Sequence, residues 1–436
     1  MLEIIPIGGY GEVGRNCTAV KHGDDIILLD MGYHVPRYIE CTEEEGETLR
    51  KVTVKALREA EAIPDDRILG DLRHDVKAIV LSHAHLDHIG AVPYLANRYR
   101  CPIVATPYCC AVLERILRDE KIKLHNQIVR LNVNSAIRFG GMKIEFINTV
   151  HSTPQTAMIA VHTDDGVILY TNDFKFDNFP TLGKRTNYDA LRRLKGKIKA
   201  LIGDALYAGT EQKTPSESVV REMLKDLEFD VAEKQGIVAT TFSSHIARLK
   251  SLMKFGFDLG RRVVFLGRSL FRYCVAAQEI GLVDFREVKI VRYADKIKKE
   301  IKRIGKKKEK YFLVVTGNQG EPKSVLRRMA EDKLKYGFSD EDCIIFSCRT
   351  IPTELNRKQR KELENELKLK GIQYFKDVHV SGHGAKEDLR ELLTMTVPEL
   401  VLPSHADKEN SKALSELCDE VGIKSRIVQN GEWIKI

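Results

Sequence analysis

The chain has 436 residues, of which 43% are hydrophobic and 30% charged, a composition typical of a globular protein with more than one hydrophobic core. No apolar stretch approaches the roughly 18 residues of a membrane span, and the acidic start Met1–Ile5 is unlike a signal peptide, so we expect a protein without a membrane association. The formal net charge of +8 permits a polyanionic partner without requiring one, and the nine cysteines contain no CxxC pair, which favours a reducing cytoplasm and disfavours a disulfide framework or a thiolate metal site.

The first predicted element is a strand, Ile4–Ile7, which runs into a glycine loop with the spacing GxGxxG at residues 9–14. With an acidic residue, Asp30, further on, this spacing is typical of dinucleotide-binding folds. Those folds need a long helix after the third glycine, whereas here the strand formers Arg15–Val20 follow, and then a second short strand, Ile26–Leu29. We therefore predict a β-hairpin and interpret the glycines as a loop where the backbone approaches another group closely.

The next predicted strand, Lys77–Leu81, runs into a loop with the pattern HxHxDH, three imidazoles and a carboxylate within six residues. Imidazole and carboxylate are ligands that zinc and manganese accept. In an extended segment His83 and His85 point the same way and can share one metal ion. Asp87 and His88, on the turn that follows, can reach a second ion. A solvated polar loop is the alternative explanation.

Two further candidate ligands stand at the ends of predicted strands. His151 follows the strand Lys143–Val150, and Asp173 follows the strand Gly166–Asn172. Either residue alone would be ambiguous. His162, just before a turn, is interpreted as an exposed hairpin residue and not as a ligand.

These strand ends, in this order, resemble the metallo-β-lactamase superfamily. Three later stretches match the acidic and histidine motifs of its β-CASP nuclease branch: Leu201–Ala205, Val380–Gly384 and Val401–His405. Three more resemble the ribonuclease J family in particular: Ile4–Asn16, Thr316–Pro322 and Arg349–Pro352. The long C-terminal extension of the bacterial members is absent, so the chain is similar to the shorter archaeal form. It departs from the family at Ser152–Gln155, where an aspartate is common, and at Ala205–Leu206, where hydroxyl residues are frequent.

The resemblance implies an α/β protein, an αββα metallo-β-lactamase sandwich with an inserted parallel α/β β-CASP domain. Because His405 lies more than 200 residues after Asp173, the first domain must be interrupted and resume. We expect metallo-β-lactamase parts at residues 1–206 and 351–436 and the β-CASP domain at 207–350. The insertion has four predicted strands, each followed by a glycine or serine loop: Gly236–Thr241, Arg262–Leu266, Tyr311–Thr316 and Cys343–Ser347. Ser244 is expected to cap a helix over His245–Lys254.

The resemblance also implies a centre of two divalent metal ions. One would be held by His83, His85 and His151, the other by Asp87, His88 and His405, with Asp173 as the bridge. Zinc is the expected metal, with manganese or magnesium as alternatives. Asp30 would orient a histidine of the site. Catalytic roles are implied for Asp87, for His383, which would protonate the leaving oxygen or bind phosphate, and for Asp204, which would orient His383.

A phosphate pocket is expected between the two domains, because the strand ends of the insertion carry hydroxyl, amide and guanidinium donors. Its expected residues are Ser243, Ser244, Arg268, Arg349, His379, Val380, Ser381, Gly382 and His383. A basic run, Asp295–Lys310, precedes one of these strands. It is either a solvated helix face or a contact with RNA phosphates.

The ligand set favours two-metal hydrolysis of a phosphodiester. The resemblance to ribonuclease J implies that the substrate is RNA in decay or processing, and that the enzyme is a 5′-to-3′ exonuclease preferring 5′-monophosphate RNA, with internal cleavage left open. A β-CASP endoribonuclease of the 3′-end-processing type shares every metal ligand and remains an alternative. A small-molecule hydrolase of the same superfamily and a non-enzymatic RNA-binding protein are the others. RNA is the expected partner, with a homodimer and RNA-decay complex partners implied by the resemblance.

Overall fold

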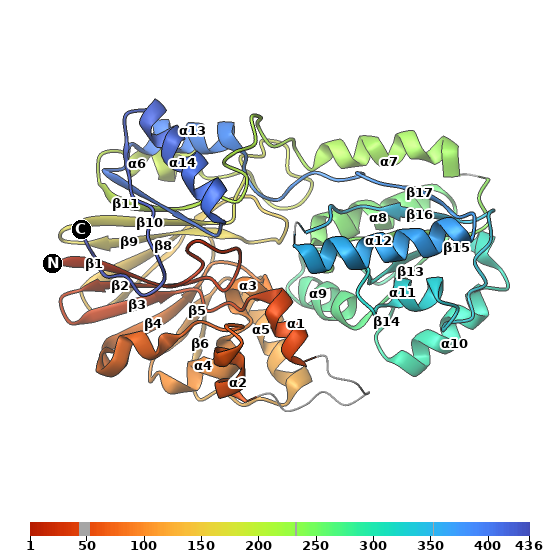
Figure 1. The fold of residues 1–436 in the computed structure, drawn as a ribbon, viewed down its shortest axis with the longest axis horizontal. Coiled ribbons are helices and arrows are strands. Elements are labelled where there is room, and N and C mark those ends of the chain that lie inside the picture. The colour runs from red at the N-terminus through yellow and green to blue at the C-terminus, as the bar shows by residue number, and fades with distance from the viewer. Residues whose placement is uncertain (43–52, 232, 352) are drawn as a thin grey trace. The chain divides into compact units, whose positions relative to one another are not determined.

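The computed structural model describes residues 1–42, 53–231, 233–351 and 353–436, so Pro352 of the stretch Arg349–Pro352 lies outside the described residues. The chain divides into two compact units, whose elements are labelled in Figure 1. Unit 1 comprises residues 1–178, 184–214 and 382–436, and unit 2 comprises residues 179–183 and 215–381. Unit 1 is thus interrupted and resumes, as the late position of His405 requires.

Unit 1 is built on two seven-stranded sheets. The first has the order β20 (Ile434–Lys435), β1 (Leu2–Gly8), β2 (Cys17–His22), β3 (Asp25–Leu29), β4 (Val76–Leu81), β5 (Ile103–Ala105) and β6 (Ile128–Arg130). The second has the order β19 (Lys424–Ser425), β18 (Leu400–Ser404), β11 (Ile198–Asp204), β10 (Gly166–Asn172), β9 (Ala157–Thr163), β8 (Met142–Asn148) and β7 (Ala136–Phe139). The strands are rich in β-branched residues, which suit a pleated buried surface.

The two sheets share one apolar core, in which side chains of both are fully buried, among them Ile4 and Val80 from the first sheet and Ile144 and Ile202 from the second. A second core lies between the second sheet and its helices α6 (Tyr188–Arg193), α13 (Lys386–Thr396) and α14 (Lys408–Glu420). The remaining helices of unit 1 lie on the side of the first sheet (Figure 1): α1 (Val35–Thr42), α2 (Val54–Glu59), α3 (Leu86–Ile89), α4 (Val92–Leu95) and α5 (Pro107–Glu120), with 3-10 turns at Asp66–Asp75 and Ala96–Arg98. This arrangement is the predicted αββα sandwich.

The β-hairpin predicted after the glycine loop is confirmed. Strands β2 and β3 pair antiparallel, with Thr18 opposite Leu29 and His22 opposite Asp25. No helix follows the third glycine, so the dinucleotide-binding interpretation is excluded. His162, by contrast, is not an exposed residue: it is half-buried on β9, and its Nε2 lies 2.9 Å from the Glu145 carboxylate on the neighbouring strand.

Unit 2 contains one six-stranded sheet whose strands all pair in parallel. Its order is β14 (Lys289–Val291), β13 (Arg262–Leu266), β15 (Tyr311–Val315), β12 (Ile237–Thr240), β16 (Cys343–Phe346) and β17 (Gln373–Phe375). Its helices are α7 (Ser218–Val231), α8 (Ile246–Asp258), α9 (Arg268–Glu279), α10 (Ala294–Ile304), α11 (Val325–Ala330) and α12 (Glu354–Leu369), with a 3-10 turn at Lys308–Lys310. The four predicted strands all form.

Two predictions for unit 2 differ from the structure. The expected domain boundary at residue 350 falls too early, because β17 pairs with β16 and places residues up to 381 in unit 2. The cap of α8 is His245 and not Ser244: the helix begins at Ile246, and Nδ1 of His245 accepts the Arg248 backbone N–H at 3.3 Å. An imidazole nitrogen here takes the place of the side-chain oxygen that usually accepts this bond at a helix start.

No helix in the described part of the chain combines the length and the apolar character that a bilayer span requires. All nine cysteines carry free thiols.

Candidate metal centre

The candidate ligands of unit 1 stand where strands of both sheets end. His83 and His85 follow β4, and the short helix α3 carries Asp87 and His88. From the second sheet come His151 after β8, Asp173 after β10 and His405 after β18. The two sheets therefore bring residues more than 300 positions apart in the sequence to one place.

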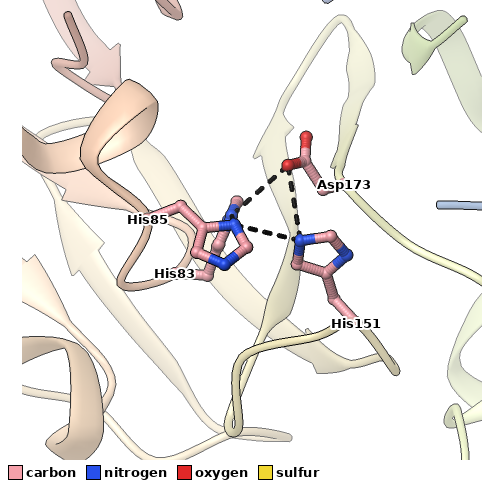
Figure 2. Close-up of side chains that lie close together, drawn as sticks. All are labelled: His83, His85, His151 and Asp173. Carbon is pink, nitrogen blue, oxygen red and sulfur yellow. Dashed lines mark hydrogen bonds and ion pairs between the residues drawn. The ribbon is translucent and has the colours of Figure 1, made fainter. Parts of the chain in front are cut away.

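Three imidazoles and one carboxylate form the first cluster, shown in Figure 2. Nδ1 of His85 lies 3.2 Å from Nε2 of His83 and 3.1 Å from Nε2 of His151. Oδ2 of Asp173 lies 3.4 Å from Nε2 of His83 and 3.5 Å from that of His151. The four ligand atoms thus face a common point, as the alternation of His83 and His85 predicted.

A second cluster faces the other oxygen of Asp173. Its Oδ1 lies 3.3 Å from Nε2 of His88 and 3.9 Å from Nε2 of His405. Oδ2 of Asp87 lies 3.7 and 3.8 Å from the same two nitrogens. Asp173 therefore contributes one oxygen to each cluster, and within each cluster all ligand atoms lie within 4.8 Å of one another.

The residues fit a pair of metal ions. Oδ1 of Asp173 is buried and makes no hydrogen bond, although a buried carboxylate oxygen without a donor is costly. Burial, and then the neighbouring imidazoles, hold the pKa of His85 and of His151 well below the ordinary histidine value, so both rings are neutral and offer lone pairs. Neutral imidazoles converging on one carboxylate are a donor set that divalent metal ions accept.

The carboxylates of the centre stay ionised despite their burial. Burial alone would raise the pKa of Asp173, but His405, His88 and His383 hold it well below the ordinary value. For His88 the balance is the reverse: burial would lower its pKa, whereas Asp173 and Asp30 raise it well above the usual range. The centre is therefore a buried site of alternating charge.

Asp30 is fully buried beneath His88 and accepts four hydrogen bonds. Its Oδ2 lies 2.7 Å from Nδ1 of His88 and accepts from the hydroxyls of Ser82, at 2.7 Å, and Tyr170, at 2.8 Å. Its Oδ1 accepts from the Ser82 backbone N–H at 2.7 Å. A carboxylate on Nδ1 holds a proton there, so the ring can release the proton on Nε2 and bind metal through that nitrogen.

Asn16 is a buried polar residue to which the sequence assigned no role. Its side-chain Nδ2 and Oδ1 lie 2.8 and 3.2 Å from Nδ1 of His405. The backbone N–H of His405 donates to Gly9 O at 2.6 Å, so the glycine loop and Asn16 together fix the late histidine. The signal available in the sequence was an amide side chain at the end of the glycine loop, just before the strand that begins at Cys17.

The loop with His383 packs directly against the first cluster. Nδ1 of His383 lies 2.7 Å from Oδ2 of Asp204, the last residue of β11, and its Nε2 lies 3.9 Å from Oδ2 of Asp173. Burial opposes the charged form, but Asp204 and Asp173 raise the pKa of His383 to about 9. Asp173, Asp204 and His383 are also close enough to hold an ion, but the short bond between His383 and Asp204 favours an oriented imidazole.

Gly382 is required for this packing. A Cβ at Gly382 would lie 2.9 Å from Cε1 and Nδ1 of His151, and its carbonyl accepts from Nδ1 of His151 at 2.7 Å. Gly382 therefore makes room for the imidazole of His151. Its expected contact with a phosphate stays a prediction.

The two departures from the family pattern have separate explanations. Gln155, where an aspartate is common, accepts the Tyr108 backbone N–H at 2.8 Å near the start of α5, while Ser152 places its hydroxyl 3.3 Å from Nε2 of His85. At the second departure, the Leu206 backbone N–H donates to Asp204 at 3.0 Å, a contact that needs no side chain at that position.

The expected phosphate-pocket residues are divided between the units. Gly382 and His383 belong to unit 1 and the other seven to unit 2. Within unit 2 the loops after β12 and β13 meet, since the Ser243 and Ser269 hydroxyls lie 2.8 Å apart. Ser244 is half-buried, and the side chains of Arg268 and Arg349 are exposed at strand ends.

His379 and Val380 lie against a buried arginine that the sequence did not single out. Arg248 is fully buried and pairs with both oxygens of Glu217, at 2.6 and 2.8 Å. It also donates to the Ser347 carbonyl at 2.7 Å and to the Val380 carbonyl at 3.3 Å. Burial, and then Arg248, lower the pKa of His379 to about 2. These two residues are therefore packed into unit 2.

Three family models match the chain in the order that the sequence motifs predict. They are the metallo-beta-lactamase superfamily at residues 10–232, the ribonuclease J beta-CASP domain at 234–365 and the Zn-dependent metallo-hydrolase RNA specificity domain at 372–428. The ribonuclease J of Methanocaldococcus jannaschii is 43% identical over 99% of this chain and 98% of its own length. The ribonuclease J of Pyrococcus abyssi is 38% identical over 100% of this chain and 97% of its own length.

A solved structure of a protein of unknown function from Enterococcus faecalis shares the fold, with a TM-score of 0.69 and 17% identity over 99% of both chains. The chain belongs to the ribonuclease J family, the metal-dependent ribonucleases of the β-CASP branch of the metallo-β-lactamase superfamily. The fold class and the family resemblance are thereby confirmed.

Proposed function

We propose that the chain is a two-metal ribonuclease that degrades RNA from the 5′ end, prefers a 5′-monophosphate, and uses zinc, with manganese as the nearest alternative. The observation that carries the proposal is the bridging position of Asp173, whose two oxygens face two separate clusters of imidazoles. The relatives named ribonuclease J, which match over nearly their whole length, support RNA as the substrate.

In this proposal His83, His85 and His151 hold one ion, Asp87, His88 and His405 hold the other, and Asp173 joins them. Two bound divalent ions supply a nucleophilic hydroxide near neutral pH and neutralise charge on the reacting phosphate. The chain's own contribution is to fix the seven ligand side chains, which Asp30 does for His88 and Asn16 for His405.

His383 is the proposed proton donor to the leaving oxygen. Asp204 holds its Nδ1, so the Nε2–H points toward Asp173 and the place where a phosphate would lie. A positioned imidazole of this kind contributes about 10²- to 10⁴-fold to rate. The proposed phosphate contacts of unit 2 are the strand-end donors Ser243, Ser244, Arg268 and Arg349.

The test uses one RNA sequence with three 5′ ends: hydroxyl, monophosphate and triphosphate. Release of mononucleotides from the 5′ end, fastest with the monophosphate, is the expected result, and a Ser244→Ala variant should lose about ten- to a hundredfold of that preference. Internal fragments that appear equally with all three ends would favour an endoribonuclease of the 3′-end-processing type. We further propose a cytoplasmic homodimer; sedimentation of the purified chain tests the oligomeric state.

A further inference from the structure

A basic groove runs along the amino ends of β13 and β15 in unit 2. It consists of two adjoining hollows of about 900 and 610 Å³, which share Gly260, Arg262, Arg303 and Tyr311 among their lining residues. Arg262 and Tyr311 are the first residues of these two strands and pair with each other. The loops proposed to bind phosphate follow the carboxyl ends of the strands. They therefore lie at the other end of the same sheet, about 16 Å away along strands of five residues.

The groove concentrates positive charge: an excess that approaches that of the whole chain lies in one small region. Seven cationic side chains and one carboxylate line the larger hollow: Arg262, Lys299, Lys302, Arg303, Lys306, Lys307, Lys310 and Glu309. The formal net charge of all 436 residues is only +8. Among the described residues, none of the five lysines of this hollow lies within ion-pair distance of a carboxylate.

A solvated helix face would look different. Some lysines elsewhere on unit 2 pair with nearby carboxylates, as Lys254 does with Asp258 at 2.8 Å and Lys225 with Glu222 at 2.9 Å. Others are single exposed charges, whereas the groove gathers five lysines in one place. On α10 the one glutamate, Glu300, pairs instead with Lys289 and Arg303, and so leaves the lysines of the groove uncompensated.

The positive field of the groove also acts on Tyr311. Burial would raise the pKa of this phenol, but Arg303, which donates to its hydroxyl at 2.6 Å, and Arg262 lower it. An anion placed in the groove would therefore meet an environment already arranged for negative charge.

We propose that this groove binds the phosphate backbone of single-stranded RNA, as a second contact with the substrate in the unit that carries no metal ligands. The inference rests on the proposed ribonuclease function. Two joined hollows suit a chain of phosphates better than one anion, and the lysines offer point charges without base-specific geometry, so binding is independent of sequence. A second copy of the chain is a poor occupant of the groove, because two-fold docking there would place the same cations opposite one another.

The test compares two triple variants with equal loss of charge. Lys299→Ala, Lys302→Ala and Lys306→Ala remove lysines of the groove. Lys298→Ala, Lys335→Ala and Lys368→Ala remove exposed, unpaired lysines of unit 2 that do not line it. The probes are a short and a long single-stranded 5′-monophosphate RNA with phosphorothioate linkages, and their binding is followed by fluorescence anisotropy over a range of salt concentrations.

Each phosphate contact to single-stranded nucleic acid contributes about 0.7 to the slope of log K against log salt. The groove variant should therefore lose a slope of about 2, and about 10- to 100-fold in affinity for the long RNA near 0.1 M salt. The ratio of short-RNA to long-RNA Kd should fall accordingly, while the control variant keeps the wild-type ratio. Melting curves establish that both variants are folded.

Equal slopes and equal affinities for the two variants would overturn the proposal and leave the lysines as a solvated surface. A poly-glutamate competitor that displaces the long RNA as well as unlabelled RNA does would also overturn it, in favour of an acidic protein partner. Failure of the proposed function is recognised separately, because the wild-type chain would then hydrolyse neither RNA when the linkages are ordinary phosphodiesters.

Discussion

Asp30 is a fully buried carboxylate that contacts His88, one of the candidate metal ligands. It satisfies four donors, including Nδ1 of His88, and it has no contact with solvent. An asparagine has the same shape and tolerates the same left-handed backbone, here at φ 59°, but it places an NH2 group against at least one of these donors.

We therefore predict that Asp30→Asn weakens metal binding by about 10- to 100-fold, the usual effect of losing the partner of a ligating histidine. Titration of the metal-free chain with zinc against a competing chelator measures this. Tyr170→Phe is the matched control, because it removes one hydroxyl from Asp30 and leaves the bond to His88 intact. If the Asp30→Asn and wild-type chains bind zinc with equal affinity, Asp30 does not position His88.

The second prediction at the residue scale concerns His383 and the carboxylate of Asp204 that holds it. His383→Ala should lower kcat by about 10²- to 10⁴-fold, because a positioned proton donor is lost, with metal content unchanged because seven other ligands remain. Asp204→Asn should give a smaller loss in the same direction, since the imidazole stays but is no longer held by a carboxylate. Elemental analysis alongside single-turnover kinetics separates a slower chemical step from loss of metal. If the His383→Ala chain is depleted of metal, His383 is a metal ligand and not the proton donor.

At the scale of elements, Arg248 on α8 connects parts of unit 2 that are distant in sequence. It pairs with Glu217 just before α7, donates to Ser347 after β16 and reaches the carbonyl of Val380. The guanidinium is fully buried, so its loss leaves a buried carboxylate without its main partner.

Arg248→Met should consequently destabilise unit 2 by about 3–5 kcal/mol at neutral pH. Arg248 and His245 hold the pKa of Glu217 well below its ordinary value against the effect of burial. Such a depressed pKa contributes stability above the unfolded value of about 4.3, and this contribution is lost as the pH falls further. The difference between variant and wild type should thus be large at pH 7 and smaller below pH ~4. Urea unfolding of both chains at the two pH values measures it; a difference independent of pH would assign the effect to packing alone.

At the scale of the whole molecule, single strands could be predicted because short apolar runs are local signals, whereas the αββα sandwich was implied by the family resemblance. HxHxDH after a buried strand predicted that His83 and His85 face one site, whereas His151 and Asp173 were assigned to it by the family resemblance. The distance to His405 predicted an interrupted domain. Contacts between remote segments could not be predicted in this way. Asn16, Arg248 and the pairing of β17 with β16 depend on tertiary neighbours, and the end of the insertion was therefore placed at residue 350 and not 381.

The ends of the main insertion lie next to each other in unit 1. The Thr214 hydroxyl donates to the carbonyl of His383 at 2.8 Å, and its backbone N–H donates to Asp388 at 2.8 Å. A short flexible linker from Thr214 to Gly382 can therefore replace residues 215–381 without displacing either end, since closing a short loop between neighbouring points costs little.

We predict that this shortened chain folds and still binds about two divalent ions, because all seven candidate ligands belong to unit 1. Its hydrolysis of long RNA should fall steeply, because the strand-end donors and the basic groove are gone, whereas hydrolysis of a small phosphodiester, which needs only the metal centre, should persist. Elemental analysis, circular dichroism and the two activity assays make the comparison with the full chain. A folded product that binds no metal would show that unit 2 is needed to assemble the centre, and the description of unit 1 as a complete metal-binding unit would be wrong.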